Sequence, residues 1–335
     1  MKKKCTIPNI LITGANGQLG SSLALLCNFK DANFFFTDVA ELDVTSKGAV
    51  EKFIAEKEID LVINCAAYTN VEKAEDESKK AERLNACAPK YLAESCKRHN
   101  AILIHISTDY VFGNRKRKVP ITERSKPSPL NVYGATKLQG EENIKASGCN
   151  YIIIRTSWLF SEYGNNFVKT MLQLLSTREE IKVVDDQIGT PTYAGDLAKA
   201  VYKISFKLLR DSSILQQHGE TENCNSKEKS DKCRVKKESS HFGTIYNYSN
   251  LGECSWYEFA TKIQQLSKVK VKATNKKCHI IPCTSKEYPT KARRPKYSLL
   301  SKEKIQRQFS LSIPTWQHSL AESLRRCRKM NKTNY

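Results

Sequence analysis

Three glycines, Gly14, Gly17 and Gly20, follow a short apolar run over Asn9–Thr13 and precede a segment with helical periodicity. Glycine permits a tight turn there and lets the backbone approach a pyrophosphate, whose negative charge is favourable at a helix N-terminus. A carboxylate, Asp38, ends the next apolar run, where it can accept hydrogen bonds from both hydroxyls of an adenosine ribose. These features predict a strand, turn and helix that bind a dinucleotide. The alternative is a glycine turn with a purely structural role.

Strand and helix patterns alternate through the first half of the chain, which predicts an α/β fold with a Rossmann-type, doubly wound parallel sheet. The expected strands are Asn9–Thr13, Asn33–Thr37, Asp60–Cys65, Ala101–Ser107, Tyr151–Arg155 and Thr244–Ser249. The expected helices are Gln18–Phe29, Ala49–Lys57, 79–99 and Leu138–Ala146.

The pattern also predicts how the chain is divided. Residues 1–157 are expected to form the nucleotide-binding core, and residues 158–330 a smaller, mainly substrate-binding lobe that partly returns to the core. Residues 210–241 are rich in Ser, Lys, Glu, Asn and Gln and contain too few large apolar side chains to offset the entropy of ordering. We therefore expect a disordered insertion there, between a helix ending near Leu209 and a strand beginning at Thr244.

The positive charge of the chain is unevenly distributed. The net charge is +20, and residues 207–335 contain 27 Lys and Arg against 11 Asp and Glu. Such a field attracts an anionic substrate such as a sugar nucleotide, although a lysine-rich solvated surface is the simpler explanation. No basic and aromatic module of a known nucleic-acid-binding type is present in the sequence, so a nucleic-acid partner is not expected.

Apolar runs and cysteines bear on the compartment. No apolar stretch approaches the roughly 20 residues of a membrane helix, so no membrane partner is expected. The basic opening Met1–Lys4 leads into only a short apolar run, which disfavours a signal peptide. The 12 cysteines are scattered, without a C-x-x-C pair or a histidine at partner spacing. We expect reduced thiols, no zinc site and a cytoplasmic protein.

Tyr133 and Lys137 begin a predicted helix and, four residues apart, lie on one of its faces. An ammonium group beside a phenol favours the phenolate and so lowers a pKa that is ordinarily about 10. Tyr133 would give a proton to a forming alkoxide, and Lys137 would tune it and hold the nicotinamide ribose. Thr108, which ends a buried strand, would bond the substrate oxygen. Alone, the pair could be a half-exposed aromatic beside a solvated lysine; in a nucleotide-binding fold it predicts reduction of a ketone.

The sequence resembles the dTDP-4-dehydrorhamnose reductase family of the extended short-chain dehydrogenase/reductase superfamily, from about Asn9 to Leu324 apart from the insertion. The matching segments are Gly14–Gly20, Asn64–Val71, Ser107–Phe112, Asn131–Glu141, Arg155–Phe160, Gly164–Val168, Asp186–Thr192 and Ala292–Pro295. The resemblance implies an NAD(P)H-dependent oxidoreductase that reduces dTDP-4-dehydro-6-deoxy-L-mannose (dTDP-4-dehydro-β-L-rhamnose) to dTDP-L-rhamnose for a cell-surface polysaccharide. It also implies a homodimer.

The resemblance assigns a role to each matching residue. Catalysis falls to Thr108, Tyr133 and Lys137. The positions implied for NADPH or NADH are Gly14, Gly17, Gln18, Leu19, Gly20, Asp38, Asp43, Val44, Ala66, Ala67, Tyr68, Tyr133 and Lys137. Those implied for the dTDP-sugar are Thr108, Asp109, Trp158 and Arg294. Arg294 is either a clamp for the diphosphate or an ordinary surface arginine. Where some relatives bind a metal through an acidic contact in the first helix, this chain has Ser22, so no metal is expected.

The sequence departs from the family pattern at two places and leaves two other functions open. Glu72 stands where aspartate is common, and the loop over 113–118 is unusually basic. One alternative is a sugar-nucleotide epimerase or dehydratase on the same fold, in which the cofactor stays oxidised and bound. The other is a non-catalytic regulatory subunit similar to the methionine adenosyltransferase beta subunit. The intact set of Thr108, Tyr133 and Lys137 argues against the second.

Overall fold

A six-stranded parallel sheet lies at the centre of the computed structural model, which describes residues 7–113, 118–219 and 241–333. The strand order is β10-β5-β4-β3-β1-β2, so the order reverses between β1 and β3. The bounds are β1 (Asn9–Thr13), β2 (Asn33–Thr37), β3 (Leu61–Asn64), β4 (Ile102–Thr108), β5 (Asn150–Thr156) and β10 (Thr244–Asn247). The predicted α/β fold is confirmed, and the reversal is where ligands bind in such sheets.

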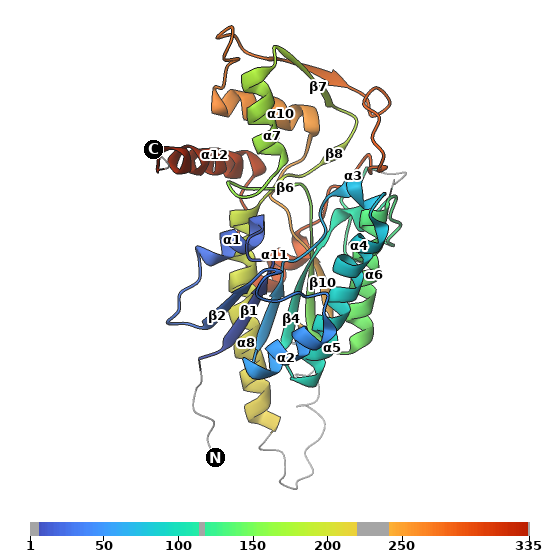
Figure 1. Ribbon diagram of the computed structural model, residues 1–335, viewed down its shortest axis with the longest axis vertical. Helices are drawn as coiled ribbons and strands as arrows, with labels where there is room; N and C mark the ends of the chain where they lie inside the picture. The colour runs from blue at the N-terminus through green and yellow to red at the C-terminus, as the bar shows by residue number, and fades with distance from the viewer. Residues whose placement is uncertain (1–6, 114–117, 220–240, 334–335) are drawn as a thin grey trace.

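Helices cover both faces of the sheet (Figure 1). Successive side chains of a strand point to opposite faces, so Ile10 and Ile12 of β1 join one apolar core and Leu11 joins the other. The first core includes α1 (Gln18–Ala24), α8 (Ala194–Gly219) and α11 (Glu303–Phe309). The second core includes α2 (Lys47–Glu56), α5 (Ala88–Arg98) and α6 (Val132–Ser147). The sheet is therefore apolar on both sides, as a parallel sheet requires.

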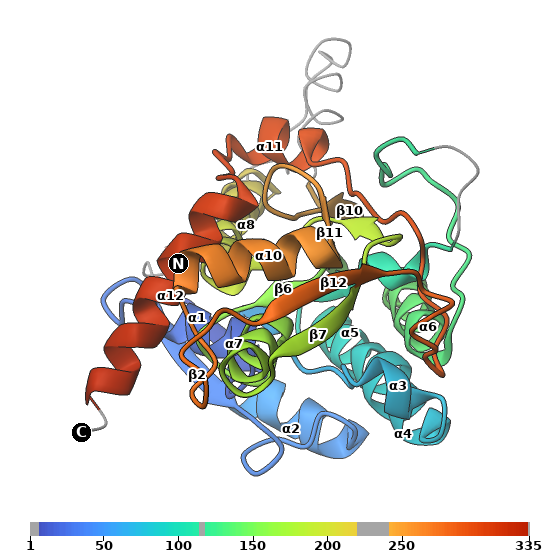
Figure 2. The same ribbon diagram turned by 90° about the horizontal axis from the view of Figure 1, so that it is seen from above.

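A second lobe lies beyond one end of the sheet and has its own apolar core (Figures 1 and 2). Its helices are α7 (Phe167–Thr177), α10 (Trp256–Ser267) and α12 (Trp316–Thr333). Its paired strands are β6 (Leu159–Phe160) with β9 (Thr192–Tyr193), β7 (Glu180–Val184) with β12 (His279–Cys283), and β8 (Ile188–Gly189) with β11 (Cys254–Ser255). The chain leaves this lobe to form α8, β10 and α11 with the sheet.

All four predicted helices have different bounds in the structure: α2 and α6 begin before the predicted starts at Ala49 and Leu138. The first ends at Ala24 and not at Phe29: the chain turns, leaving Leu25 exposed, and the ring of Phe29 packs edge-on against Phe34 with centroids 5.7 Å apart. The segment predicted as one helix over 79–99 is α4 (Ser78–Glu82), a π-helical turn (Arg83–Cys87) and α5 in succession.

The predicted insertion over 210–241 is wrong at its beginning. The helix does not end near Leu209, because α8 continues to Gly219. His241, at the other end, is buried: its Nε2 lies 3.1 Å from Asp211 Oδ2 and its Nδ1 lies 2.6 Å from Gln308 Nε2. The remaining part of the prediction, 220–240, lies outside the described residues. The strand predicted from Thr244 is β10.

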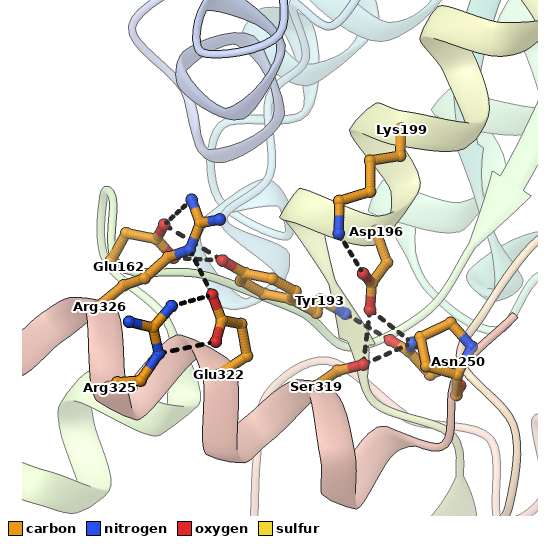
Figure 3. A network of polar contacts seen from close by, with 10 residues as sticks. Glu162, Tyr193, Asp196, Lys199, Asn250, Ser319, Glu322, Arg325 and Arg326 are labelled. Atoms are coloured by element: carbon orange, nitrogen blue, oxygen red, sulfur yellow. Dashed lines mark hydrogen bonds and ion pairs between the residues drawn. The ribbon is translucent and has the colours of Figure 1, made fainter.

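A polar network fastens α12 to the start of α8 (Figure 3). Asp196 Oδ2 accepts hydrogen bonds from Ser319 Oγ at 2.5 Å and from Asn250 Nδ2 at 3.0 Å, and all three side chains are buried. Beside them, the Tyr193 hydroxyl donates to Glu162 at 3.1 Å, and Arg326 of α12 lies 3.7 Å from the same carboxylate. These contacts hold a helix of the second lobe against one that packs on the sheet.

Candidate active site

A cavity of ≈ 860 Å³ opens between the sheet and the second lobe, beside the point where the strand order reverses. Most of the predicted site residues line it. They are Gly14, Gly17, Gln18, Leu19, Asp38, Asp43, Val44, Ala66, Ala67, Thr108, Asp109, Tyr133, Lys137 and Trp158. Gly20, Tyr68 and Arg294 are not among the residues that line it. The fold thus brings together residues from six separate stretches of the chain.

The glycine turn leaves no room for side chains. Gly14 has a positive φ of 64°, and a Cβ there would lie 2.7 Å from the Ala66 nitrogen. A Cβ on Gly20 would lie 2.5 Å from the Gly14 carbonyl oxygen, so only glycine at position 20 lets the helix pack this closely against the turn. Gly17 caps the start of α1 without a side-chain hydrogen bond, which leaves backbone N–H groups available beside the cavity. The turn fits the pyrophosphate of a dinucleotide cofactor.

Acidic and basic side chains meet where the adenosine end of a dinucleotide would lie. Asp38 accepts hydrogen bonds from Asn16 N and Val39 N, which orient its carboxylate at the cavity wall. The side-chain and backbone hydrogen bonds from Thr45 lower the pKa of Asp43. Lys80 and Arg83, from α4 and the π-helical turn, also line the cavity. No short motif in the sequence points to these two cations, because both lie outside the glycine motif.

The helix that carries the predicted catalytic pair is fixed at its start. Asn131 caps α6 by accepting a hydrogen bond from Gly134 N at 2.8 Å. A Cβ on Gly134 would lie 2.2 Å from the Tyr110 carbonyl oxygen, so only glycine allows α6 to approach this closely. The ring of Tyr133 packs edge-on against that of Tyr110, with centroids 5.4 Å apart.

The titration of Tyr133 differs from the expectation. Burial raises the pKa of Tyr133, and a hydrogen bond with Thr108 opposes this rise only partly. Burial, and not the expected ammonium of Lys137, therefore dominates the pKa of Tyr133. The Lys137 Nζ contacts two residues of β4. It donates to the Ile106 carbonyl at 2.6 Å and lies 3.2 Å from His105 Nε2. Burial also lowers the pKa of Lys137 to about 8. The cofactor-free site therefore holds its proton on the phenol.

Asp109 follows Thr108 at the end of β4 and is almost completely buried. Its Oδ1 accepts from the Thr108 hydroxyl at 3.2 Å, whereas its Oδ2 has no hydrogen-bond partner among the described residues. Burial raises its pKa to about 6, and hydrogen bonds from Ser298 and Thr108 limit the rise. A buried acceptor with a free oxygen in a cavity wall suits a ligand hydroxyl.

Trp158 lies in the left-handed backbone region, with φ 46°, which is a strained conformation for a bulky residue. Its indole stacks on that of Trp256, and both line the cavity. Sequence reasoning missed Trp256, since it stands 98 positions away and belongs to no short motif. The two rings together form an apolar wall, which suits the face of a deoxysugar.

Two predicted binding residues have structural partners. The Tyr68 hydroxyl donates to Glu77 Oε2 at 3.0 Å. Arg294 Nη2 lies 2.6 Å from Glu72 Oε1, and Glu72 Oε2 also accepts from Lys291 N at 2.9 Å. Glu72 thus ties the segment around Arg294 to α3 (Val71–Ala74). Arg294 also interacts with Tyr110, which lines the cavity, so it lies near the cavity rim.

Within 7–113, 118–219 and 241–333, no helix combines the length and apolarity needed to cross a membrane. In the same ranges, no group of three or more His, Cys, Asp or Glu side chains is arranged to hold a metal ion.

Comparison with known proteins gives consistent matches over nearly the whole chain. The family model described as the RmlD substrate binding domain matches residues 8–224 and 231–329. The dTDP-4-dehydrorhamnose reductase of Aggregatibacter actinomycetemcomitans is 40% identical over 313 residues, which are 93% of this chain and 96% of that protein.

Solved structures agree with these matches. The crystal structure of dTDP-4-dehydrorhamnose reductase from Bacillus anthracis in complex with NADP superposes with a TM-score of 0.81 at 35% identity, covering 96% of this chain and 100% of that one. A UDP-glucose 4-epimerase from Thermus thermophilus in complex with NAD has a TM-score of 0.68 at 15% identity, covering 96% and 99% of the two chains. The second likeness shows the fold alone.

Proposed function

The chain belongs to the RmlD substrate binding domain family, and we propose that its cavity carries out the reaction of the dTDP-4-dehydrorhamnose reductases. That reaction is the reduction of the 4-keto group of dTDP-4-dehydro-β-L-rhamnose to give dTDP-L-rhamnose, with NADPH or NADH as the reductant. The observation that carries the proposal is the meeting of Thr108, Tyr133 and Lys137 in one cavity with the glycine turn.

The residues of the cavity divide the binding work between cofactor and sugar. The glycine turn would hold the pyrophosphate, and Asp38 the adenosine ribose. Lys137, on the same wall as Tyr133, would hold the nicotinamide ribose. Trp158 would support the apolar side of the deoxysugar, and Asp109 would accept a hydrogen bond from one of its hydroxyls. When bound, NADPH or NADH supplies the hydride.

The chemical role of the protein is to place a proton and to stabilise charge. The Thr108 hydroxyl would bond the carbonyl oxygen of the sugar and favour the negative charge that develops there. Tyr133 holds its proton firmly in the free site, because burial raises its pKa. Reduction turns the weakly basic carbonyl oxygen into a strongly basic alkoxide, so the proton passes from the Tyr133 hydroxyl to the sugar oxygen.

We expect the cofactor and sugar sites to divide at the predicted boundary between residues 157 and 158. Residues 1–157 would provide the cofactor site and the catalytic side chains, and residues 158–330 the wall facing the sugar through Trp158 and Trp256. A cytoplasmic homodimer is the expected form of the enzyme. Light scattering coupled to size-exclusion chromatography tests the dimer, and fractionation of the native cells tests the compartment.

Neither alternative function has a specific observation in its favour. The likeness to a UDP-glucose 4-epimerase is at 15% identity and extends to the fold only. A regulatory subunit would not require the partly buried Tyr133 and the buried Lys137 to line the cavity beside Thr108. The three residues and the 40% identity to a reductase support catalysis.

One assay separates the three possibilities. Purified protein is incubated with NADPH and dTDP-4-dehydro-β-L-rhamnose while nicotinamide absorbance is followed, and the product is identified by NMR. We expect stoichiometric NADPH oxidation and dTDP-L-rhamnose. A protein that purifies with oxidised cofactor and interconverts sugar nucleotides without net oxidation would be an epimerase or a dehydratase. A protein inert toward every sugar nucleotide but bound to a second polypeptide would be a regulatory subunit.

A further inference from the structure

A chain of buried polar side chains leads from the first strands of the sheet to Lys137. Asn64, at the end of β3, and His105, in β4, are both buried. The Asn64 amide nitrogen lies 3.0 Å from His105 Nδ1, and His105 Nε2 lies 3.2 Å from Lys137 Nζ. The Thr13 hydroxyl donates to Asn64 Oδ1 at 2.7 Å. The proposed mechanism assigns no role to Asn64 or His105.

The direction of the hydrogen bonds in this chain is fixed by one backbone group. Ala66 N–H donates to Asn64 Oδ1 at 3.1 Å, and a backbone N–H can only donate, so this atom is the amide oxygen. The other amide atom of Asn64 is therefore the NH₂ group, which donates to His105 Nδ1. With its lone pair at Nδ1, a neutral imidazole carries its hydrogen on Nε2.

The Nε2–H of His105 then points at the nitrogen of Lys137. An ammonium group has three donors and no acceptor, so it cannot receive this hydrogen bond. A neutral amine has a lone pair for His105 and still has hydrogens to donate, one of which goes to the Ile106 carbonyl at 2.6 Å. Every group in the chain is satisfied only when Lys137 is neutral.

The other groups around Lys137 are consistent with this state. Burial lowers the pKa of Lys137 to about 8, while Glu141 on its own helix and Cys65 after β3 act in the opposite direction. Glu141 is itself paired with Arg155, whose Nη2 lies 2.5 Å from Glu141 Oε2, and both are buried. Burial lowers the pKa of His105 well below its ordinary value, so the imidazole stays neutral.

We propose that Asn64 and His105 are positioning residues that favour the neutral amine of Lys137 in the cofactor-free enzyme, so that in alkaline solution the binding of NADPH is coupled to the uptake of a proton. The inference rests on the proposed function, because it takes the cavity as the NADPH site. The diphosphate adds negative charge to the cavity and favours the ammonium form. Since the ammonium cannot accept from His105, Lys137 leaves this partner and its hydrogens become available to the ribose hydroxyls.

Two measurements on the wild-type enzyme test the proposal. Nitrogen-15 NMR of the histidines, without cofactor, should find His105 with its hydrogen on Nε2; a hydrogen on Nδ1 would overturn the proposal. Calorimetric titration with NADPH alone, in buffers of different ionisation enthalpy, counts protons taken up. We expect uptake approaching one proton at about pH 9 and falling toward zero at about pH 6.5. NADPH binding without uptake at the higher pH would contradict the coupling, whereas no NADPH binding would count against the proposed function.

Two variants separate hydrogen-bond direction from structural support. Asn64→Asp keeps the shape and the acceptor for Ala66 N but replaces the NH₂ donor by an acceptor, so His105 must carry its hydrogen on Nδ1 and accept from an ammonium. We expect proton uptake at about pH 9 to fall at least threefold. The matched control is His105→Gln, whose amide can accept from Asn64 and donate to Lys137, and we expect it to keep the uptake. Equal uptake in wild type and both variants would refute the proposal. If Asn64→Asp does not fold, the wild-type tautomer and the His105→Gln uptake decide.

Discussion

The indole of Trp256 lies flat against that of Trp158, with ring centroids 3.6 Å apart and ring planes 9° apart. The edge of Trp158 is confined as well, because a Cβ on Gly189 would lie 2.8 Å from two of its ring carbons. The strained backbone of Trp158 is therefore held by packing on one face and by a glycine at one edge. Trp158, held in this way, lines the cavity.

Gly189→Ala should displace the Trp158 indole and weaken binding of the sugar. We expect the KM for the sugar nucleotide to rise about tenfold, equivalent to ~1.4 kcal/mol, with no change in the Kd for NADPH. Steady-state kinetics and fluorescence titration measure the two quantities. The matched control is Gly48→Ala, where a Cβ meets nothing within 4 Å. A similar loss of NADPH affinity in Gly189→Ala would mean that the wall does not belong to the sugar site.

Tyr133→Phe removes only the hydroxyl that would protonate the sugar oxygen. We expect kcat to fall by at least ~100-fold, the usual range for loss of a positioned acid, with the melting temperature nearly unchanged. Tyr91→Phe, on α5 and not among the cavity residues, is the control and should keep wild-type turnover. Near-normal turnover in Tyr133→Phe would show that another group gives the proton.

Asp38 is expected to govern the choice between the two nicotinamide cofactors. A carboxylate bonds a free ribose 2′-hydroxyl and repels a 2′-phosphate, but Lys80 and Arg83 line the same cavity and moderate the repulsion. We expect kcat/KM for NADH to lie within about tenfold of that for NADPH, and Asp38→Asn to shift the ratio toward NADPH. A wild-type preference for NADPH above about a hundredfold would contradict the role given to Asp38.

Asp109 should make sugar binding depend on pH. Its pKa is raised to about 6 by burial, so it is protonated below that pH and its oxygens become weaker acceptors for a sugar hydroxyl. The KM for the sugar nucleotide should rise as the pH falls through about 6, with little change in the Kd for NADPH. Asp109→Asn should have a raised KM at every pH and no such step. If the step persists in Asp109→Asn, another group causes it.

Arg294 is expected to exchange its partner when substrate binds. It is paired with Glu72 in the free structure, and a diphosphate near the rim offers a stronger, doubly bonded partner. Arg294→Ala should raise the KM for the sugar nucleotide and the Ki for dTDP about tenfold or more, as for a lost charged hydrogen bond. Arg293→Ala, at an exposed neighbour, should change neither. If the two substitutions raised KM and Ki equally, Arg294 would act only through its positive charge and not through a specific bond to the diphosphate.

Short sequence motifs were sufficient to predict those site residues whose spacing along the chain is only a few residues. The glycine turn, Asp38, and the pair of Tyr133 and Lys137 each depend on spacings of a few residues, and the sheet places all of them at one cavity. Trp256 and Arg83 could not be found this way. Each reaches the cavity only because the chain returns to it, and a single sequence carries no record of such contacts.

The elements that the sequence misjudged depend on close tertiary approach. The π-helical turn Arg83–Cys87 lies where α6 comes closest, since a Cβ on Gly140 would lie 2.1 Å from the Asn85 carbonyl oxygen. The Asn85 side chain there bonds both the nitrogen and the carbonyl of Tyr68. Helical periodicity alone cannot distinguish such a turn from an α-helix. Likewise, the polar composition after Leu209 led to the prediction of a disordered segment where α8 continues to Gly219.

The return of the chain to the sheet has a consequence for dissecting the protein. A fragment ending at residue 157 would contain the glycine turn and the catalytic pair but would lack α8 and β10. Without β10, the backbone of β5 becomes an open strand edge, to which other chains can add. Without α8, Leu19 and Leu23 of α1 lose an apolar covering. The cofactor-binding half of the chain would therefore aggregate when expressed alone, so gene fusions and truncations should keep residues 194–219 and 244–247 with it.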